Sequence, residues 1–192
     1  MKTPGVYIVE KSAFPNSVVE APTAIPAFIG ITEKAVNGAD TLSGKPWKIT
    51  SMTEFQQYFG GAPAPEFRLS VVDYPEKDAS KTFYGIPSPD KSKLLRVEAP
   101  EVTFSLYYQM VMFFANGGGT CYIVSAGTYD QKSLIDKEKV VAALTALKKE
   151  QEITMVLVPE AVSVDECKDI QTQVLAHCGE MMNRFAILDV QP

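Results

Sequence analysis

The sequence of 192 residues contains few of the residue types on which catalytic and metal sites usually depend. It has one histidine, His177, and three cysteines, Cys121, Cys167 and Cys178. General acid–base catalysis usually employs histidine or matched carboxylates, and a zinc site needs closely spaced cysteine or histidine pairs. The cysteines are odd in number and unevenly spaced, which favours buried thiols in a reducing compartment over a disulfide framework. We therefore expect a chain that is synthesised in the cytoplasm, is not an enzyme, and binds no metal and no cofactor.

Long apolar runs and an excess of positive charge are also missing. No stretch reaches the roughly 18 apolar residues needed to span a bilayer, and the N-terminus lacks the apolar segment of a secretory signal. The formal net charge is −5, whereas a nucleic-acid surface requires clustered Lys and Arg. The composition therefore predicts no nucleic-acid partner and no direct contact with a membrane. The length suits one generous domain or a domain with an appendage.

The first 22 residues are predicted to form an extended N-terminal arm. A β-branched and aromatic run lies between Pro4 and Pro15, neither of which can donate a ladder hydrogen bond. A terminal strand this short needs a sheet edge, either in its own molecule or in a neighbouring subunit. The residues predicted to pair with that edge are Gly5, Val6, Tyr7, Ile8, Val9 and Glu10. The predicted hinge of the arm consists of Pro15, Asn16 and Ser17.

Residues 23–61 are predicted to form the first part of a core domain. Residues 26–31 are continuously apolar, which is typical of a strand buried on both faces. Ser51 and Glu54 fit a capping box that opens a helix. The glycine pair that follows is expected to end this helix, because a left-handed cap favours a residue without a Cβ.

Residues 62–98 are predicted to form a Pro-rich surface insertion. Prolines recur throughout the segment and break any helix, while Lys, Asp and Ser fill the intervals. Loops longer than about 15 residues are usually functional or disordered. Within the segment, residues 69–72 have the composition of a strand.

Residues 99–192 are predicted to form the α/β part of the core domain. Pro100, with acidic residues on either side, is typical of a helix start, and residues 104–114 are apolar around most of a helical circumference. This pattern predicts a buried helix and favours a core role for its aromatic side chains over a ligand slot. The helix is expected to end in a structural motif that consists of Phe114, Asn116, Gly117, Gly118 and Gly119.

The remaining sequence alternates between strand and helix patterns. The strand-like segments are residues 121–124, 153–158 and 185–188. Residues 137–149 are helical, and a Ser163/Glu166 capping box opens a second helix. The positions predicted to share one apolar face are Val140, Val141, Leu144 and Leu147 in the first helix, and Val164, Cys167, Ile170, Val174 and Cys178 in the second.

The order of these patterns predicts an α/β (mixed α+β) fold. A sheet of parallel strands would have flanking helices, an extended N-terminal β arm and a Pro-rich insertion. The sequence stops soon after its last strand, where a parallel sheet normally continues into a covering helix. We therefore expect either a fragment that lacks a C-terminal half or a shortened relative of a longer protein.

Three features could be interpreted as ligand or catalytic sites, and each has a simpler structural interpretation. The glycine run at 117–119 follows a helix and precedes a strand, the reverse of a phosphate-binding fingerprint, and so predicts a turn. His177 and Cys178 point about 100° apart on a helix, so the thiol is expected to fill the core. Asp189 follows a strand, where ligand sites of α/β sheets gather, but a turn-forming role there is as common.

Three stretches of the sequence occur in an informative order. They are Thr3-Pro4-Gly5-Val6-Tyr7-Ile8-Val9-Glu10 with residues 21–23 and 27–30; residues 51–55 through 59–61; and residues 113–124. In order and rough spacing they resemble the N-terminal half of contractile tail sheath proteins, which build the outer sleeve of contractile phage tails and related injection machines. The resemblance implies a structural subunit that assembles helically around an inner tube, with neighbouring subunits linked by exchanged arms.

The resemblance also implies partners and a location. The partners are other copies of the chain, an inner tube protein contacted through the expected C-terminal half, and baseplate and terminator proteins. The assembled location is a phage tail or a contractile injection particle. Two alternatives stay open: a nucleotide- or metabolite-binding α/β enzyme domain, and a baseplate or collar relative that uses the sheath fold without contraction.

Overall fold

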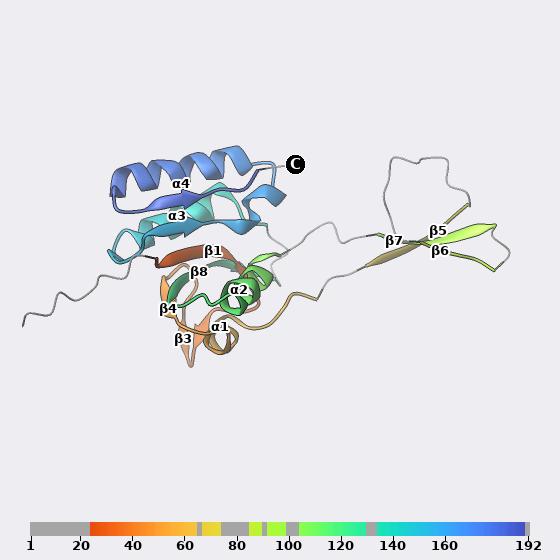
Figure 1. Ribbon diagram of the computed structural model, residues 1–192, viewed down its shortest axis with the longest axis horizontal. Helices are drawn as coiled ribbons and strands as arrows, with labels where there is room; N and C mark the ends of the chain where they lie inside the picture. Colours follow the sequence, from red (N-terminus) through yellow and green to blue (C-terminus); the bar gives the residue numbers. More distant parts are fainter. Residues whose placement is uncertain are drawn as a thin grey trace, which may run out of the picture.

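A computed structural model describes residues 24–64, 67–73, 85–89, 92–98, 104–129 and 134–190 of the chain. The predicted mixed α/β fold is confirmed in these residues. Helices flank both faces of a five-stranded sheet, and a three-stranded sheet stands away from this core (Figure 1).

The five-stranded sheet has the order β10-β9-β1-β8-β4. Its strands are β1 (Pro26–Thr32), β4 (Trp47–Ile49), β8 (Cys121–Thr128), β9 (Met155–Leu157) and β10 (Phe185–Ile187). β1 pairs in parallel with both β8 and β9, and β9 pairs in parallel with β10. The parallel orientation predicted for the C-terminal strands is thus present, whereas the place of β1 between β8 and β9 was not predicted. β4 runs antiparallel to β8. All of β1 is buried, because it is the central strand and side chains pack on both of its faces.

One face of the sheet is covered by α3 (Lys137–Leu147) and α4 (Cys167–Met181), which lie together above the strands β1 and β8 in Figure 1. The prediction for the buried stripe of α3 is wrong at Val141, which is exposed. The buried face of α3 is formed by Val140, Ala143, Leu144 and Leu147, and Val141 points roughly 100° away from the centre of that face. The predicted positions that are buried are Val140, Leu144 and Leu147 in α3, and Cys167, Ile170, Val174 and Cys178 in α4.

The start of α4 differs from the prediction. Ser163 and Glu166 do not form a capping box, because Ser163 belongs to a 3₁₀ turn, Pro159–Ser163, and α4 begins at Cys167. Glu166 Oε2 instead accepts a hydrogen bond from the backbone N–H of Lys137 (3.0 Å), the first residue of α3. A local sequence pattern cannot reveal this cap, because its two residues come from different helices.

The segment after β1 contains a short hairpin and the first helix. β2 (Val36–Asn37) and β3 (Asp40–Thr41) pair in antiparallel fashion, and α1 (Met52–Phe59) follows β4. The capping box predicted for α1 is present. Ser51 Oγ accepts a hydrogen bond from the Glu54 N–H (3.2 Å), and Glu54 Oε2 accepts one from the backbone N–H of the residue before Ser51 (2.6 Å).

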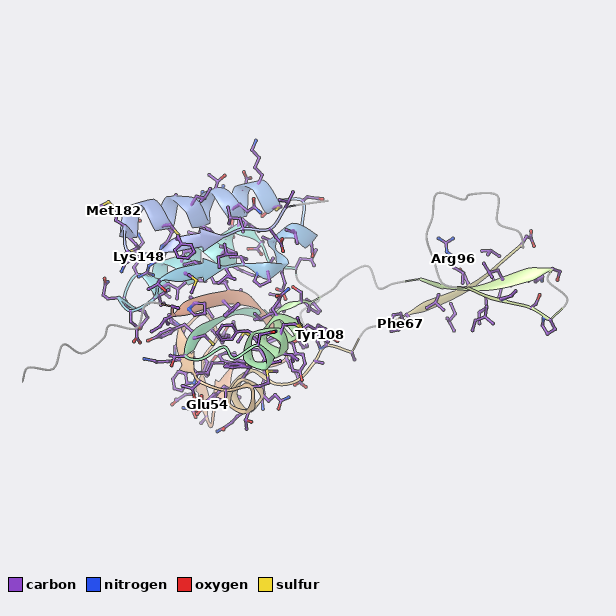
Figure 2. The ribbon with its side chains drawn as sticks, in the orientation of Figure 1. Glu54, Phe67, Arg96, Tyr108, Lys148 and Met182 are labelled. Atoms are coloured by element: carbon purple, nitrogen blue, oxygen red, sulfur yellow. The ribbon has the colours of Figure 1, made fainter. Side chains whose placement is uncertain are left out.

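α2 (Leu106–Ala115) covers the second face of the sheet together with α1, but it is shorter and less buried than predicted. The prediction of a helix start at residues 98–101 is wrong, because Glu98 ends a strand and α2 begins at Leu106. The prediction of burial all round is also wrong. Leu106 and Met110 face the core, whereas three large side chains on the outer side of the helix are exposed: Tyr108, Val111 and Met112. Tyr108 is labelled in Figure 2.

The insertion contains an antiparallel three-stranded sheet. Its strands are β5 (Arg68–Asp73), β6 (Gly85–Pro87) and β7 (Lys93–Glu98), in the order β5-β7-β6. The strand predicted within residues 69–72 is confirmed, but β6 and β7 were not predicted. Both depend on pairing with residues distant in the sequence, and such pairing overrides the weak local preference of these segments.

Candidate assembly surfaces

β10 forms an open edge of the five-stranded sheet. Within the described part of the chain, no strand pairs with its outer side. Phe185 and Ile187 are 57% and 46% exposed, so the strand predicted at residues 185–188 is an edge strand with an apolar surface. The Phe185 N–H donates to the Thr154 carbonyl beside it (3.0 Å). Because main-chain groups alternate along a strand, the N–H and C=O of Ala186 point to the open side. Such an edge is a template for strand addition.

The exposed side chains of β10 lie on a part of the sheet that no described helix covers. Ala186 packs with the core under α3 and α4, so its neighbours Phe185 and Ile187 point to the opposite face. Ile187 is in register with Leu157, which borders the core under α1 and α2. Those two helices pack over the other half of this face. β9 and β10 therefore present a bare apolar strip beside α2.

A groove lies between the bare strip and the C-terminal half of α2. Its volume is about 470 Å³. The lining residues come from β1, β9, α2 and the turn after α2: Phe28, Leu157, Gln109, Met112, Phe113, Asn116, Gly117 and Gly118. The lining is largely apolar, and its polar side chains are the amides of Gln109 and Asn116. The groove therefore suits apolar side chains better than a charged ligand.

The turn at the end of α2 forms one wall of this groove and contains the predicted structural motif. Asn116 Nδ2 donates to the Met112 carbonyl (2.7 Å), which satisfies an end group of the helix. Gly117 has φ of 84°, which favours glycine. A Cβ at Gly118 would lie 2.6 Å from the ring of Phe113. Nothing lies within 4 Å of the position that a Cβ would take on Gly119. The ring of Phe114, the remaining motif residue, packs edge-on to Phe113.

The first described residues of the chain lie close to the open edge. Ile25 N–H donates to Thr154 Oγ1 (3.0 Å), and Thr154 N–H donates to the Ile25 carbonyl (2.9 Å). The same Thr154 accepts the hydrogen bond from Phe185, the first residue of β10. Two strand spacings, roughly 10 Å, therefore separate the start of β1 from the start of β10.

The predicted arm itself falls outside the described residues. This holds for the proposed pairing residues Gly5, Val6, Tyr7, Ile8, Val9 and Glu10, and for the proposed hinge Pro15, Asn16 and Ser17. The structure thus describes the residues that follow the predicted arm, from residue 24 on, and an open strand edge. The arm and its pairing with that edge stay predictions.

A buried carboxylate, Glu160, ties the sheet to the start of α2. Its Oε2 accepts the Ile31 N–H (2.8 Å), and its Oε1 accepts the N–H groups of Ser105 (3.1 Å) and Leu106 (3.2 Å). Ile31 lies at the register shift in the β1–β8 pairing. Burial raises the pKa of Glu160 to about 7, and the three N–H donors act in the opposite direction. Glu160 therefore caps α2 from a distant part of the chain.

The residues considered above as ligand or catalytic candidates, His177, Cys178 and Asp189, have the following surroundings. His177 is buried 3.4 Å from Arg184 Nη1, and burial together with that cation lowers its pKa. Arg184 donates to the carbonyl of Leu147 (3.2 Å), the last residue of α3, and to that of Glu150 (2.9 Å) in the turn that follows. Cys178 is buried beside this cluster, and burial raises the pKa of its thiol. The main-chain carbonyl of Asp189 accepts a hydrogen bond from Gln171 Nε2 (2.6 Å).

No cluster of three or more potential metal ligands is present among the described residues. In the same part of the chain, no helix is both long enough and apolar enough to cross a membrane. Comparison with known proteins adds no assignment: no family model matches the chain, and no curated protein matches it.

Sequence reasoning missed two elements of these surfaces. Glu160 follows Pro159 at the end of a strand-like run and resembles an ordinary first-turn acid, so its burial has no local signal. The open edge at β10 was missed because a β-rich run of three or four residues does not specify its position within a sheet. The exposed face of α2 had a partial signal, since its polar residue Gln109 lies next to the exposed side chains.

Proposed function

We propose that the chain is a structural subunit of a contractile tail sheath, in which the N-terminal arm of one copy adds to the β10 edge of the next. The observation that carries this proposal is the position of the open apolar edge two strands from the point where the arm joins the core. The order of the three sheath-like sequence stretches supports the same assignment.

The arm suits the edge in length and composition. Residues 10–23 can extend to about 45 Å, far more than the separation between β1 and β10, so the arm can reach a neighbouring molecule. Added strands are held by main-chain hydrogen bonds, each of which contributes about 0.5–1.5 kcal/mol net. Burial of two side chains of Val6–Val9 against Phe185 and Ile187 adds a few kcal/mol more. Each joint would then be stable while its hinge lets the subunits reorient.

Contraction in this proposal needs no catalytic group. An extended sheath would be metastable, and contraction would improve the contacts between subunits while the arms keep the lattice connected. Packing differences between two states drive a change of this kind. The inner tube, the baseplate and the terminator are partners of this proposed assembly, and the phage tail or injection particle is its proposed location.

The arm and the edge can be tested separately in the full protein. We expect that deletion of residues 1–20, and independently Ile187→Lys, leave a folded core that no longer forms tubes or rings in negative-stain electron microscopy. Leu175→Lys is the matched control, because Leu175 is a similarly exposed apolar side chain on α4. Circular dichroism and a cooperative thermal transition would establish that each variant is folded.

Tubes of normal length formed without the arm would refute strand exchange. Assembly could instead be lost on arm deletion but survive Ile187→Lys and Phe185→Lys. That result would show that the arm is required but does not bind at the β10 edge. Closed rings or short stacks in place of long tubes would favour the baseplate or collar relative, because only a sheath grows long.

A further inference from the structure

The three-stranded sheet of the insertion has one strongly apolar face. Residues directly opposite each other in an antiparallel ladder lie on the same face. Leu69 is in register with Val97, Val71 with Leu95, and Ile86 with Leu95. Leu69, Val71 and Ile86 are 65%, 63% and 67% exposed. An exposed apolar face of this kind marks an interaction site in a soluble protein.

The opposite face of the same sheet is more polar. It carries Ser70 in register with Arg96, which extends from it in Figure 2. It also carries the apolar pair Val72 and Leu94, and Leu94 is buried. The two faces differ in exposure: Leu94 is buried on this face, whereas the large apolar side chains Leu69, Val71 and Ile86 of the first face are exposed. In Figure 1 the sheet stands apart from the α/β core, so its apolar face is not covered by the core of its own molecule.

A second layer is needed to complete this structure. A small sheet becomes stable when its apolar face packs against a helix or another sheet. Two sheets that pack face to face lie about 10 Å apart, with their strands within roughly 30° of each other. The covering layer must itself present apolar side chains at strand spacing.

The register of β5 and β7 makes the apolar face complementary to itself. Each apolar residue of β5 lies beside an apolar residue of β7, and the pair at the end of the ladder is Asp73 and Lys93, of opposite charge. Consider a two-fold axis that lies between the two facing sheets, parallel to the strands and midway between β5 and β7. This axis would place β5 of each copy over β7 of the other. Val71 would then face the other copy's Leu95, and Asp73 would face its Lys93.

We propose that the β5-β7-β6 sheet is a self-association surface, which packs through its Leu69, Val71 and Ile86 face onto the same face of a second copy of this chain. The opposite charges of Asp73 and Lys93 favour a second copy over an unrelated partner, because one symmetric arrangement satisfies both charges and both apolar strands. This contact is independent of the β10 edge and would join two molecules side by side.

The experiment measures the oligomeric state of the full chain by sedimentation velocity, in an Ile187→Lys background that removes strand addition at β10. We expect a reversible dimer that Val71→Lys abolishes and Leu175→Lys leaves unchanged. A folded α/β core does not show that the β5-β7-β6 sheet of the Val71→Lys variant is folded. The charge variants therefore provide a second, independent test of the contact. Asp73→Lys and Lys93→Asp should each be monomeric alone and should form a heterodimer when mixed.

The mixed sample is the decisive arm of the experiment. In it, Lys at position 73 of one copy faces Asp at position 93 of the other, and Lys93 faces Asp73, so both contacts become attractive. Three results would each overturn the proposal. The dimer could persist in Val71→Lys, the protein with the unaltered sheet could stay monomeric at high concentration, or the two charge variants could fail to associate on mixing. None of these results would bear on the arm, because arm docking is already blocked in the background used.

Discussion

At the scale of single residues, Glu160 shows how a distant side chain can determine where a helix begins. The segment before α2 has no side-chain cap of its own: Ser105 is the N-cap residue, and its hydroxyl makes no capping bond. Glu160 supplies that cap and also bonds the main chain of β1 at its register shift. Gly30 leaves room for this arrangement, since a Cβ there would lie 3.0 Å from Leu106 and 3.2 Å from Glu160 Oε2.

The raised pKa of Glu160 predicts a pH dependence of stability. The unfolded chain releases this proton near the ordinary value of 4.5, whereas the folded protein holds it to about pH 7. The stabilising contribution of the protonated group is therefore complete below pH 4.5 and is lost as the pH rises through 7. A shift of this size corresponds to roughly 3 kcal/mol. Glu160→Gln should remove this pH dependence, as measured by the free energy of unfolding in urea from pH 4.5 to 7.5.

The control for this measurement is Glu138→Gln, which alters an exposed carboxylate in the first turn of α3. Only the Glu160 variant should change the slope of stability against pH relative to the wild type. Buried His177 is present in all three proteins, so its opposite dependence, a loss of stability as the pH falls below 6.5, cancels in the comparison. Parallel curves for wild type and Glu160→Gln would show that the carboxyl group titrates normally.

At the scale of elements, α2 illustrates what a sequence pattern can and cannot establish. Its existence and its glycine-rich end were predictable, because aromatic and aliphatic residues favour a long regular element and Asn-Gly-Gly-Gly ends one. Its first residue and its exposed side were not predictable. Composition that is apolar all round does not distinguish a helix buried on every side from one that packs on one side and offers the other to a partner.

The end of α2 gives a paired prediction with two adjacent glycines. Gly118→Ala should destabilise the protein by about 1–3 kcal/mol, because its Cβ would meet the Phe113 ring and carbonyl at 2.6 Å. Gly119→Ala is the matched control and should be nearly neutral, because nothing lies within 4 Å of its Cβ position. Thermal unfolding of the two variants measures the difference. Equal melting temperatures would contradict the close packing described for this turn.

At the scale of the whole molecule, the arrangement leaves two surfaces incomplete: the β10 edge with its bare strip, and the apolar face of the insertion sheet. Both are made of strands, and both expose side chains that a covering layer would bury. A protein that assembles into a lattice needs more than one contact per copy, since a single symmetric contact closes into a dimer. The two surfaces together meet this requirement for the proposed sheath.

The open side of β10 gives a prediction on assembly that leaves the fold intact. Ala186→Pro removes the outward N–H of the edge strand, while the ladder with β9 uses the N–H of Phe185. We expect a folded protein with an unchanged circular dichroism spectrum that no longer assembles into tubes. Electron microscopy and light scattering would measure this loss. Normal assembly of a folded Ala186→Pro protein would show that strands do not add at this edge.

The sequence by itself determined the elements whose causes are local. These elements depend on residues within a few positions of one another. They are the buried run of β1, the capping box of α1, the glycine turn after α2, and the alternation of strands and helices in the C-terminal half. Only the tertiary structure decided which strand lies at an edge, that Glu160 caps α2, and that β5, β6 and β7 pair into a sheet. These features depend on contacts between residues far apart in the chain, and no local pattern encodes the free energy of such contacts.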